Sequence, residues 1–297
     1  MGNDHAHHHS HHHDVKNIKT AFFLNLAFTI IELIGGLFVN SVAILSDAIH
    51  DLGDSLSLGL SWYFQKLSKK GRDKSFSYGY KRFALLGAII NSMVLLCGSL
   101  IIIIETVPRI WSPEMPDTKG MILLSILGIV FNGMAVLKMK SGDSINEKVV
   151  FLHLLEDVLG WVAVLIGSLV MMYFKIALID PLLSLMITMF ILYNVYKNIK
   201  NSFRVILQGS PKILDHNVIK SYILTLNNVI DVHDFHTWSL DGSYHIATIH
   251  IVVKEGTSIE HQCQIKTQVR HYLKERSIDH MTIEIDQEEE ICELENC

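Results

Sequence analysis

The sequence predicts a membrane protein in two parts: an all-α domain of six transmembrane helices, followed by a C-terminal α+β domain in the order αββαβ. Hydrophobic residues make up 49 % of the 297 residues and charged residues 19 %, whereas soluble domains carry about 25 % charged residues. The long apolar runs fill about the first two thirds of the chain and end near Gln208. Beyond that point, helical and strand periodicities of a soluble domain replace them.

Six apolar runs are each long enough for a helix of about 20 residues, the length that crosses a bilayer. An alternative is that these runs are buried core helices of a soluble protein. Six such long runs in so short a chain make this alternative a poor explanation. We expect the spans at Thr20–Val39, Val42–Phe64, Phe83–Val107, Met121–Met139, Val150–Phe174 and Ile176–Tyr196.

The distribution of Lys and Arg beside these spans predicts their orientation. One set of flanks carries most of the basic residues before the last third of the chain, whereas the opposite flanks carry Arg109, Lys119 and Lys175. Because basic loops stay in the cytoplasm, both termini are expected there. We therefore expect a histidine-rich tail over residues 1–16, a transmembrane domain over 17–207 and a cytoplasmic domain over 208–297.

The cytoplasmic domain is expected to contain two helices and three strands on the pattern of its apolar residues. Asp241-Gly242 is a hairpin signal between the first two strands, and Ser258 is a suitable N-cap for the second helix. This order suggests helices on one face of a small sheet. The elements are expected at Asp215–Leu226, Val232–Leu240, Tyr244–Lys254, Ser258–Arg276 and Met281–Asp286.

Charge and cysteine content exclude several classes of protein. A net charge of −5 argues against a nucleic-acid partner. The four cysteines are too few and too scattered for a disulfide framework. The first apolar run follows a histidine tract and is too long for the core of a signal peptide, so no cleaved leader is expected.

Ionisable residues within the expected spans indicate a metal site. His50 and Asp54 lie in the second span, and His153 and Asp157 lie in the fifth. Residues at i and i+4 share one face of a helix, so each span presents one imidazole and one carboxylate. Two facing pairs would form a tetrahedral nitrogen–oxygen set suited to Zn²⁺. The alternative is a set of interhelical hydrogen bonds that only stabilise the bundle.

Further acidic residues accompany these pairs. Asp47, Asp51 and Glu156 lie on the same two helices and either orient the ligands or belong to solvated helix ends. Glu32 in the first span and Glu105 near the outer end of the third are expected to be structural residues of the bundle interior.

Several motifs resemble those of the cation diffusion facilitator family, and the resemblance covers nearly the whole chain from Lys19 onward. The run from Asn40 to Asp54 is similar to that family's second-helix signature, and His153–Gly160 to its fifth-helix motif. Phe76–Phe83 resembles its loop before the third helix, and Val232–Ser239 the first strand of its cytoplasmic domain. The nearest branch is that of bacterial zinc and cadmium exporters. Ala84 departs from the pattern, because the family often has an acidic residue there.

The resemblance implies a homodimer in the bacterial plasma membrane that exports Zn²⁺, together with the similar cations Cd²⁺ and Co²⁺, in exchange for protons by alternating access. The residues support this chemistry, because imidazole and carboxylate ligands bind metal only when deprotonated. The protein is then a transporter and not an enzyme. A membrane-embedded zinc enzyme is the alternative, but the sequence has no His-Glu-x-x-His motif and no obvious general base. A zinc sensor is the other alternative, although it would leave six polar-lined spans unexplained.

Two further groups of residues are candidate metal ligands. The tail His5, His7, His8, His9, His11, His12 and His13 has the composition of a metal-capturing segment, and we expect it to be an unstructured native segment and not an expression tag. The resemblance also implies a regulatory zinc site in the cytoplasmic domain. Its candidate ligands are His233, His250, His280, Glu284, Cys292 and Cys297.

Overall fold

The computed structural model describes residues 11–68, 70–138, 145–288 and 290. The chain divides into two compact units. The first comprises residues 1–66 and 87–199, and the second comprises residues 67–86 and 200–297.

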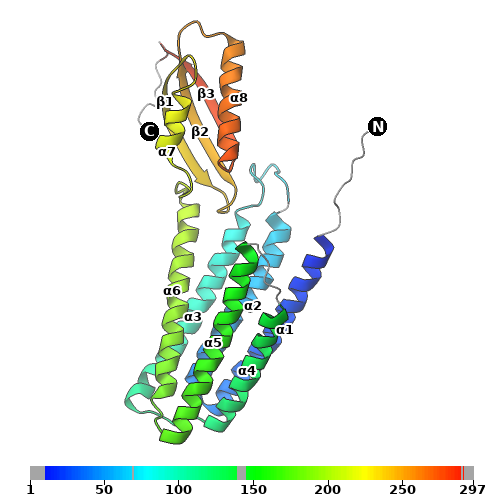
Figure 1. Cartoon of the computed structure of the whole chain (residues 1–297), viewed down its shortest axis with the longest axis vertical. Helices are drawn as coiled ribbons and strands as arrows, with labels where there is room; N and C mark the ends of the chain where they lie inside the picture. The colour runs from blue at the N-terminus through cyan, green and yellow to red at the C-terminus, as the bar shows by residue number, and fades with distance from the viewer. Residues whose placement is uncertain (1–10, 69, 139–144, 289, 291–297) are drawn as a thin grey trace. The chain divides into compact units, whose positions relative to one another are not determined.

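Six long helices lie in the described part of the chain before residue 207 and run alongside one another (Figure 1). The apolar runs therefore form helices as the sequence predicts, and several extend by a few residues beyond the expected ends. The sixth begins three residues later than expected and continues past Tyr196 into a basic segment. Their bounds are α1 His11–Val39, α2 Val42–Ser68, α3 Phe83–Trp111, α4 Thr118–Lys138, α5 Ile145–Phe174 and α6 Ile179–Ile206.

Three stretches within the described residues are long and apolar enough to cross a membrane: Phe83–Trp111, Leu155–Phe174 and Ile179–Ile206. Shorter apolar helical stretches cover Asn25–Val39 and Thr118–Met134. Helix α2 is less apolar because it carries three aspartates at positions 47, 51 and 54. A helical membrane domain is thus confirmed, while the count of six spans stays a prediction.

Close helix contacts in the first unit depend on aromatic packing and on small residues. Phe28 on α1 stacks on Phe131 of α4, with ring centroids 4.7 Å apart, and lies edge-on to Trp161 of α5. Gly128 on α4 lies against Trp161, because a Cβ there would come within 2.2 Å of the indole. A side chain at this position would force α4 and α5 apart.

Helix α1 begins earlier than the sequence predicts. The helix starts at His11, so residues 11–16 are helical and not an unstructured tail. The remaining tail histidines, residues 5 to 9, lie outside the described residues. The segment from His11 to Thr20 contains no Gly or Pro, the two residues that most disfavour a helix interior, so the extension is permitted.

The second unit contains a three-stranded sheet with strand order β1-β2-β3. Strands β1 (Val229–Ser239) and β2 (His245–Val253) pair antiparallel, and β3 (Ile278–Gln287) pairs parallel to β2. Helices α7 (His216–Ile223) and α8 (Ile259–Glu275) complete the predicted order αββαβ.

Both helices pack on the same face of this sheet, which confirms the expected arrangement. Their apolar side chains join alternate residues of β2 in one buried cluster that includes Ile219, Ile223, Ala247, Ile249, Ile251, Val253, Ile265, Val269 and Leu273. The intervening β2 residues point to the opposite face because side chains alternate along a strand. His250 is one of these intervening residues.

Local signals in the second unit act as predicted. The Ser258 hydroxyl accepts a hydrogen bond from the His261 N–H at 3.3 Å and caps α8. Asp215 caps α7 in the same way, so this helix begins one residue later than expected. At the hairpin, Gly242 has φ +93°, and the Asp241 carboxylate accepts backbone N–H bonds from Ser243 and Tyr244.

Candidate metal sites

Three candidate ligands from α2 and α5 converge in the interior of the helix bundle. His50 Nε2 lies 3.9 Å from Asp54 Oδ2, one turn along α2, and 3.9 Å from Asp157 Oδ1 on α5. One ligand atom of each residue lies within 4.8 Å of the other two. All three side chains are largely buried, with 17, 27 and 10 % exposed. One nitrogen and two carboxylate oxygens therefore face a common point.

The fourth predicted ligand, His153, lies on α5 one turn before Asp157. Its side chain is outside the described residues. The helical backbone nevertheless places it on the same face of α5 as Asp157, since i and i+4 positions share a face.

The start of α2 is held in place by a carboxylate from α6. Asp180 accepts hydrogen bonds from the Ser41 hydroxyl at 2.5 Å and from the N–H groups of Val42 at 2.9 Å and Ala43 at 3.3 Å. Asp180 is 1 % exposed. Helix N-termini have free N–H groups and a partial positive charge, so a buried carboxylate is a strong cap. This cap fixes α2 about two turns before His50.

Helix α2 is also held by its neighbours near the ligands. A Cβ on Gly53 would come within 2.4 Å of Leu95 on α3, so the two helices approach closely there. Asn25 on α1 donates hydrogen bonds to the Asp51 carbonyl at 3.2 Å and to the Ser55 hydroxyl at 3.0 Å. These contacts with α1 and α3 restrict the turn of α2 that carries His50 and Asp54.

The accompanying acidic residues have different surroundings. Asp47, Asp51 and Glu32 are buried, with 6, 4 and 1 % exposed, whereas Glu156 is exposed. Glu105 is half-exposed and pairs with Arg109 at 2.8 Å. Glu105 is therefore part of a surface ion pair on α3, away from the bundle interior where the sequence placed it.

A second candidate cluster lies in the second unit, on the sheet face opposite the helices. His233 on β1 and His250 on β2 are paired across the strands, with ring centroids 5.4 Å apart. Asp286 Oδ2 on β3 lies 3.0 Å from His250 Nδ1 and 3.5 Å from His233 Nε2. These three residues also offer ligand atoms within 4.8 Å of one another.

Two more carboxylates approach His250. Its Nε2 lies 3.5 Å from Glu284 and 3.6 Å from Asp234. Asp234 has φ +47° and lies in an irregularity of β1 between His233 and His236. Such a bulge redirects a side chain, and Asp tolerates positive φ better than most residues.

The predicted ligands of this domain are only partly brought together. His233 and His250 lie in the cluster, and Glu284 lies beside His250. His280 instead pairs with Ile246 in the sheet, four residues before His250, and its ring contacts Tyr78. Cys292 and Cys297 lie outside the described residues. Asp234 and Asp286 were not predicted as ligands from the sequence. Asp286 could have been found, because it continues the alternation that includes His280 and Glu284.

Comparison with known proteins covers both units. Residues 18–207 match the cation efflux transmembrane domain, and residues 211–288 match the cytoplasmic domain of cation efflux proteins. The two matched domains together cover most of the chain.

Curated relatives match over nearly their full length. The chain is 32 % identical to the "Cadmium, cobalt and zinc/H(+)-K(+) antiporter" of Bacillus subtilis (strain 168), over 95 % of this chain and 92 % of that protein. It is 29 % identical to the "Metal cation efflux system protein CzcD" of Cupriavidus metallidurans, over 96 % and 90 %. It is 27 % identical to the "Zinc transporter ZitB" of Pectobacterium atrosepticum, over 99 % and 91 %. With both family domains matched in order, the chain belongs to the cation efflux family, the cation diffusion facilitators.

Proposed function

We propose that the protein exports divalent cations, with Zn²⁺ as the main substrate, in exchange for protons. The observation that carries this proposal is the convergence of His50, Asp54 and Asp157 from α2 and α5 within the bundle. An ionisable group within a membrane is costly and is usually functional. The names of the antiporters and zinc transporters similar to this chain support the same activity.

The donor set favours Zn²⁺ among common cations. We propose His153 as the fourth ligand, because it repeats on α5 the spacing of His50 and Asp54 on α2. Two imidazoles and two carboxylates suit tetrahedral Zn²⁺. Cd²⁺ and Co²⁺ are proposed as further substrates because they also accept nitrogen ligands. Mg²⁺ and Ca²⁺ require more oxygen ligands.

Proton exchange follows from the same ligands. Imidazole and carboxylate hold a metal ion only in their deprotonated forms, so protonation of the site releases the cation. We propose that the site opens alternately to the two sides of the membrane by movement of the helices that carry it. It would bind Zn²⁺ from the cytoplasm and accept protons when it opens outward.

We further propose that both termini are cytoplasmic and that the protein acts as a homodimer in a bacterial plasma membrane. The basic flanks of the spans support this orientation. The cluster of His233, His250 and Asp286 is proposed as a second Zn²⁺ site. It would stabilise the cytoplasmic domain, since metal bound to a folded domain adds to its stability.

Transport by the purified protein tests this proposal. The full-length chain is reconstituted in liposomes that contain a zinc indicator and a pH indicator. A proton gradient should drive Zn²⁺ movement, and an imposed Zn²⁺ gradient should move protons in the opposite direction. Zn²⁺ movement that does not respond to the proton gradient would contradict antiport, and its complete absence in folded protein would contradict transport.

A further inference from the structure

A basic pocket in the second unit has no role in the metal chemistry described above. It lies between the segment that joins α2 to α3 and the β1–β2 hairpin, and its volume is about 540 Å³. Pockets that bind small ligands have volumes of about 300–1,000 Å³. The pocket is therefore large enough for a small polar ligand.

The side chains around this pocket carry a net positive charge. Lys70, Arg72 and Lys81 line it together with one carboxylate, that of Asp241. The Asp241 oxygen accepts hydrogen bonds from the backbone of the hairpin turn. The Asp241 carboxylate therefore already has hydrogen-bond partners in the turn.

The lysines also have partners, whereas Arg72 is available for a ligand. Lys70 donates to the Tyr80 hydroxyl at 2.9 Å and pairs with Asp73 at 3.2 Å. Tyr80 also donates to Asp73, and this hydrogen bond lowers the pKa of Asp73 so that its carboxylate stays charged. The ammonium of Lys81 lies 4.0 Å above the ring of Tyr244. No carboxylate of the described residues pairs with Arg72.

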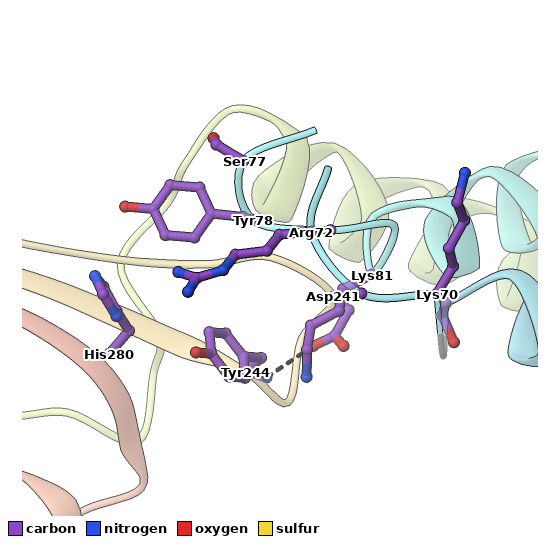
Figure 2. A pocket seen from close by; sticks show the side chains of 11 residues that line it. Lys70, Arg72, Ser77, Tyr78, Lys81, Asp241, Tyr244 and His280 are labelled. Carbon is purple, nitrogen blue, oxygen red and sulfur yellow. Dashed lines mark hydrogen bonds between the residues drawn. The ribbon is translucent and has the colours of Figure 1, made fainter. Parts of the chain in front are cut away.

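The guanidinium of Arg72 is directed into the pocket. Figure 2 shows its side chain extending into the space between Tyr78, Tyr244 and His280. Tyr78, Tyr244 and His280 line the same pocket and add hydroxyl and imidazole groups to it. A pocket that contains a guanidinium together with hydroxyl and imidazole groups is well suited to bind a phosphate, which accepts several hydrogen bonds at once.

The position of this segment in the chain favours a ligand at the membrane surface. It follows α2 directly and precedes α3, which is long and apolar enough to span a membrane. Clusters of basic residues next to a span attract anionic phospholipids. The basic residues between positions 66 and 82 are Lys66, Lys69, Lys70, Arg72, Lys74, Lys81 and Arg82, and Asp73 is the one acidic residue among them.

From these observations we infer that the pocket binds a phosphate-bearing anion, with Arg72 as the main ligand-binding residue and Lys81 as the second. The ligand is either the headgroup of an anionic phospholipid or free phosphate, which share the same chemistry. Bound there, it contacts both the α2–α3 segment and the β1–β2 hairpin. The inference does not depend on metal transport.

Binding to the full-length protein in a neutral detergent tests the inference. Its melting temperature is measured against short-chain phosphatidylglycerol, against phosphatidylcholine of the same chain length, and against inorganic phosphate. A saturable rise with phosphatidylglycerol alone identifies the lipid headgroup. A similar rise with inorganic phosphate identifies free phosphate. Either result supports the inference if it depends on Arg72.

Variants establish that dependence. Arg72→Gln should weaken binding about fivefold, because one basic residue near an anionic surface contributes about 1 kcal/mol. Lys81→Gln should weaken it as well and serves as the comparison if Arg72→Gln lowers the melting temperature without ligand. Arg270→Gln is the matched control, since Arg270 is exposed on α8 and does not line the pocket. If neither ligand gives a saturable rise, or if Arg270→Gln weakens binding as much as Arg72→Gln, the inference is wrong.

Discussion

His50 on α2 and Asp157 on α5 approach to 3.9 Å between Nε2 and Oδ1. The two helices are far apart in the sequence, so this contact exists only when the bundle is assembled. A change in the distance between α2 and α5 would change the geometry of the site. Alternating access by movement of these helices would therefore change metal affinity as well as accessibility.

The nitrogen ligand should determine which metals are accepted. His50→Asp replaces an imidazole by a carboxylate, so transport should shift toward Mn²⁺, which prefers oxygen ligands. His153→Asp should act in the same direction. The ratio of Zn²⁺ to Mn²⁺ transport rates in liposomes measures this effect, and we expect the ratio to fall by about tenfold or more. An unchanged ratio in both variants would argue against selectivity by the ligand set.

The buried cap of α2 should contribute to stability. Asp180→Ala removes the acceptor of the Ser41, Val42 and Ala43 hydrogen bonds and leaves buried N–H groups without a partner. The unfolding free energy in detergent should decrease by about 1–3 kcal/mol.

Two further variants distinguish the stability lost with the cap from the stability lost through any substitution. Asp180→Asn keeps one carbonyl acceptor and should recover part of the loss. Asp117→Ala removes an exposed side chain that accepts a bond from Lys119 N–H near the start of α4, and should have less effect. Equal losses in Asp180→Ala and Asp117→Ala would show that burial of the cap is unimportant.

The sheet cluster should bind Zn²⁺ independently of transport. In protein that already carries Asp54→Ala and Asp157→Ala, calorimetry should still detect Zn²⁺ binding and a rise in melting temperature. Adding His250→Ala or Asp286→Ala should weaken this binding by more than about tenfold, because each removes a ligand of the cluster.

Three other residues predicted as ligands from the sequence show how far this site extends. His280→Ala should leave binding intact, because His280 lies at another position on β3. Cys292→Ser combined with Cys297→Ser tests whether the terminal cysteines take part. Binding that survives His250→Ala unchanged would contradict a site at this cluster.

The histidine-rich tail should help to capture metal without forming part of the transport path. Deletion of residues 2–13 should leave the maximal Zn²⁺ transport rate nearly unchanged. It should raise the half-saturating Zn²⁺ concentration about threefold, because a tethered binding segment raises the local metal concentration. Since α1 begins at His11, a second deletion of residues 2–10 separates loss of histidines from shortening of the helix. A large loss of maximal rate in both would give the tail a direct part in transport.

Helical spacing made much of the transport site predictable. The i, i+4 spacing of His50 and Asp54 places them on one face of α2 wherever that helix lies, and the bilayer makes a second such pair on α5 informative. The Asp180 cap was missed, because nothing local links the start of α6 to the start of α2. Contacts of this kind arise only from the tertiary arrangement.

The sheet cluster shows a different limit. Alternation places His280 and Glu284 on one face of β3, but four residues along a strand separate them by about 13 Å. Which of them lies beside His250 depends on the strand register, which pairs His250 with Glu284. The position of Asp234 depends on an irregularity in β1, and the alternating pattern contains no sign of it.

We propose that His50, Asp54 and Asp157 form one proton-coupled transport site. It is tested most directly by recording Zn²⁺ and proton movement together in liposomes that contain Asp54→Ala, Asp157→Ala or Glu156→Ala protein. Glu156 is exposed on α5 next to Asp157, so its variant is the matched control. We predict that both aspartate variants lose Zn²⁺ transport and the linked proton movement by more than about tenfold, and that Glu156→Ala keeps both. Normal coupled transport in folded Asp54→Ala or Asp157→Ala protein would contradict a transport site formed by these residues.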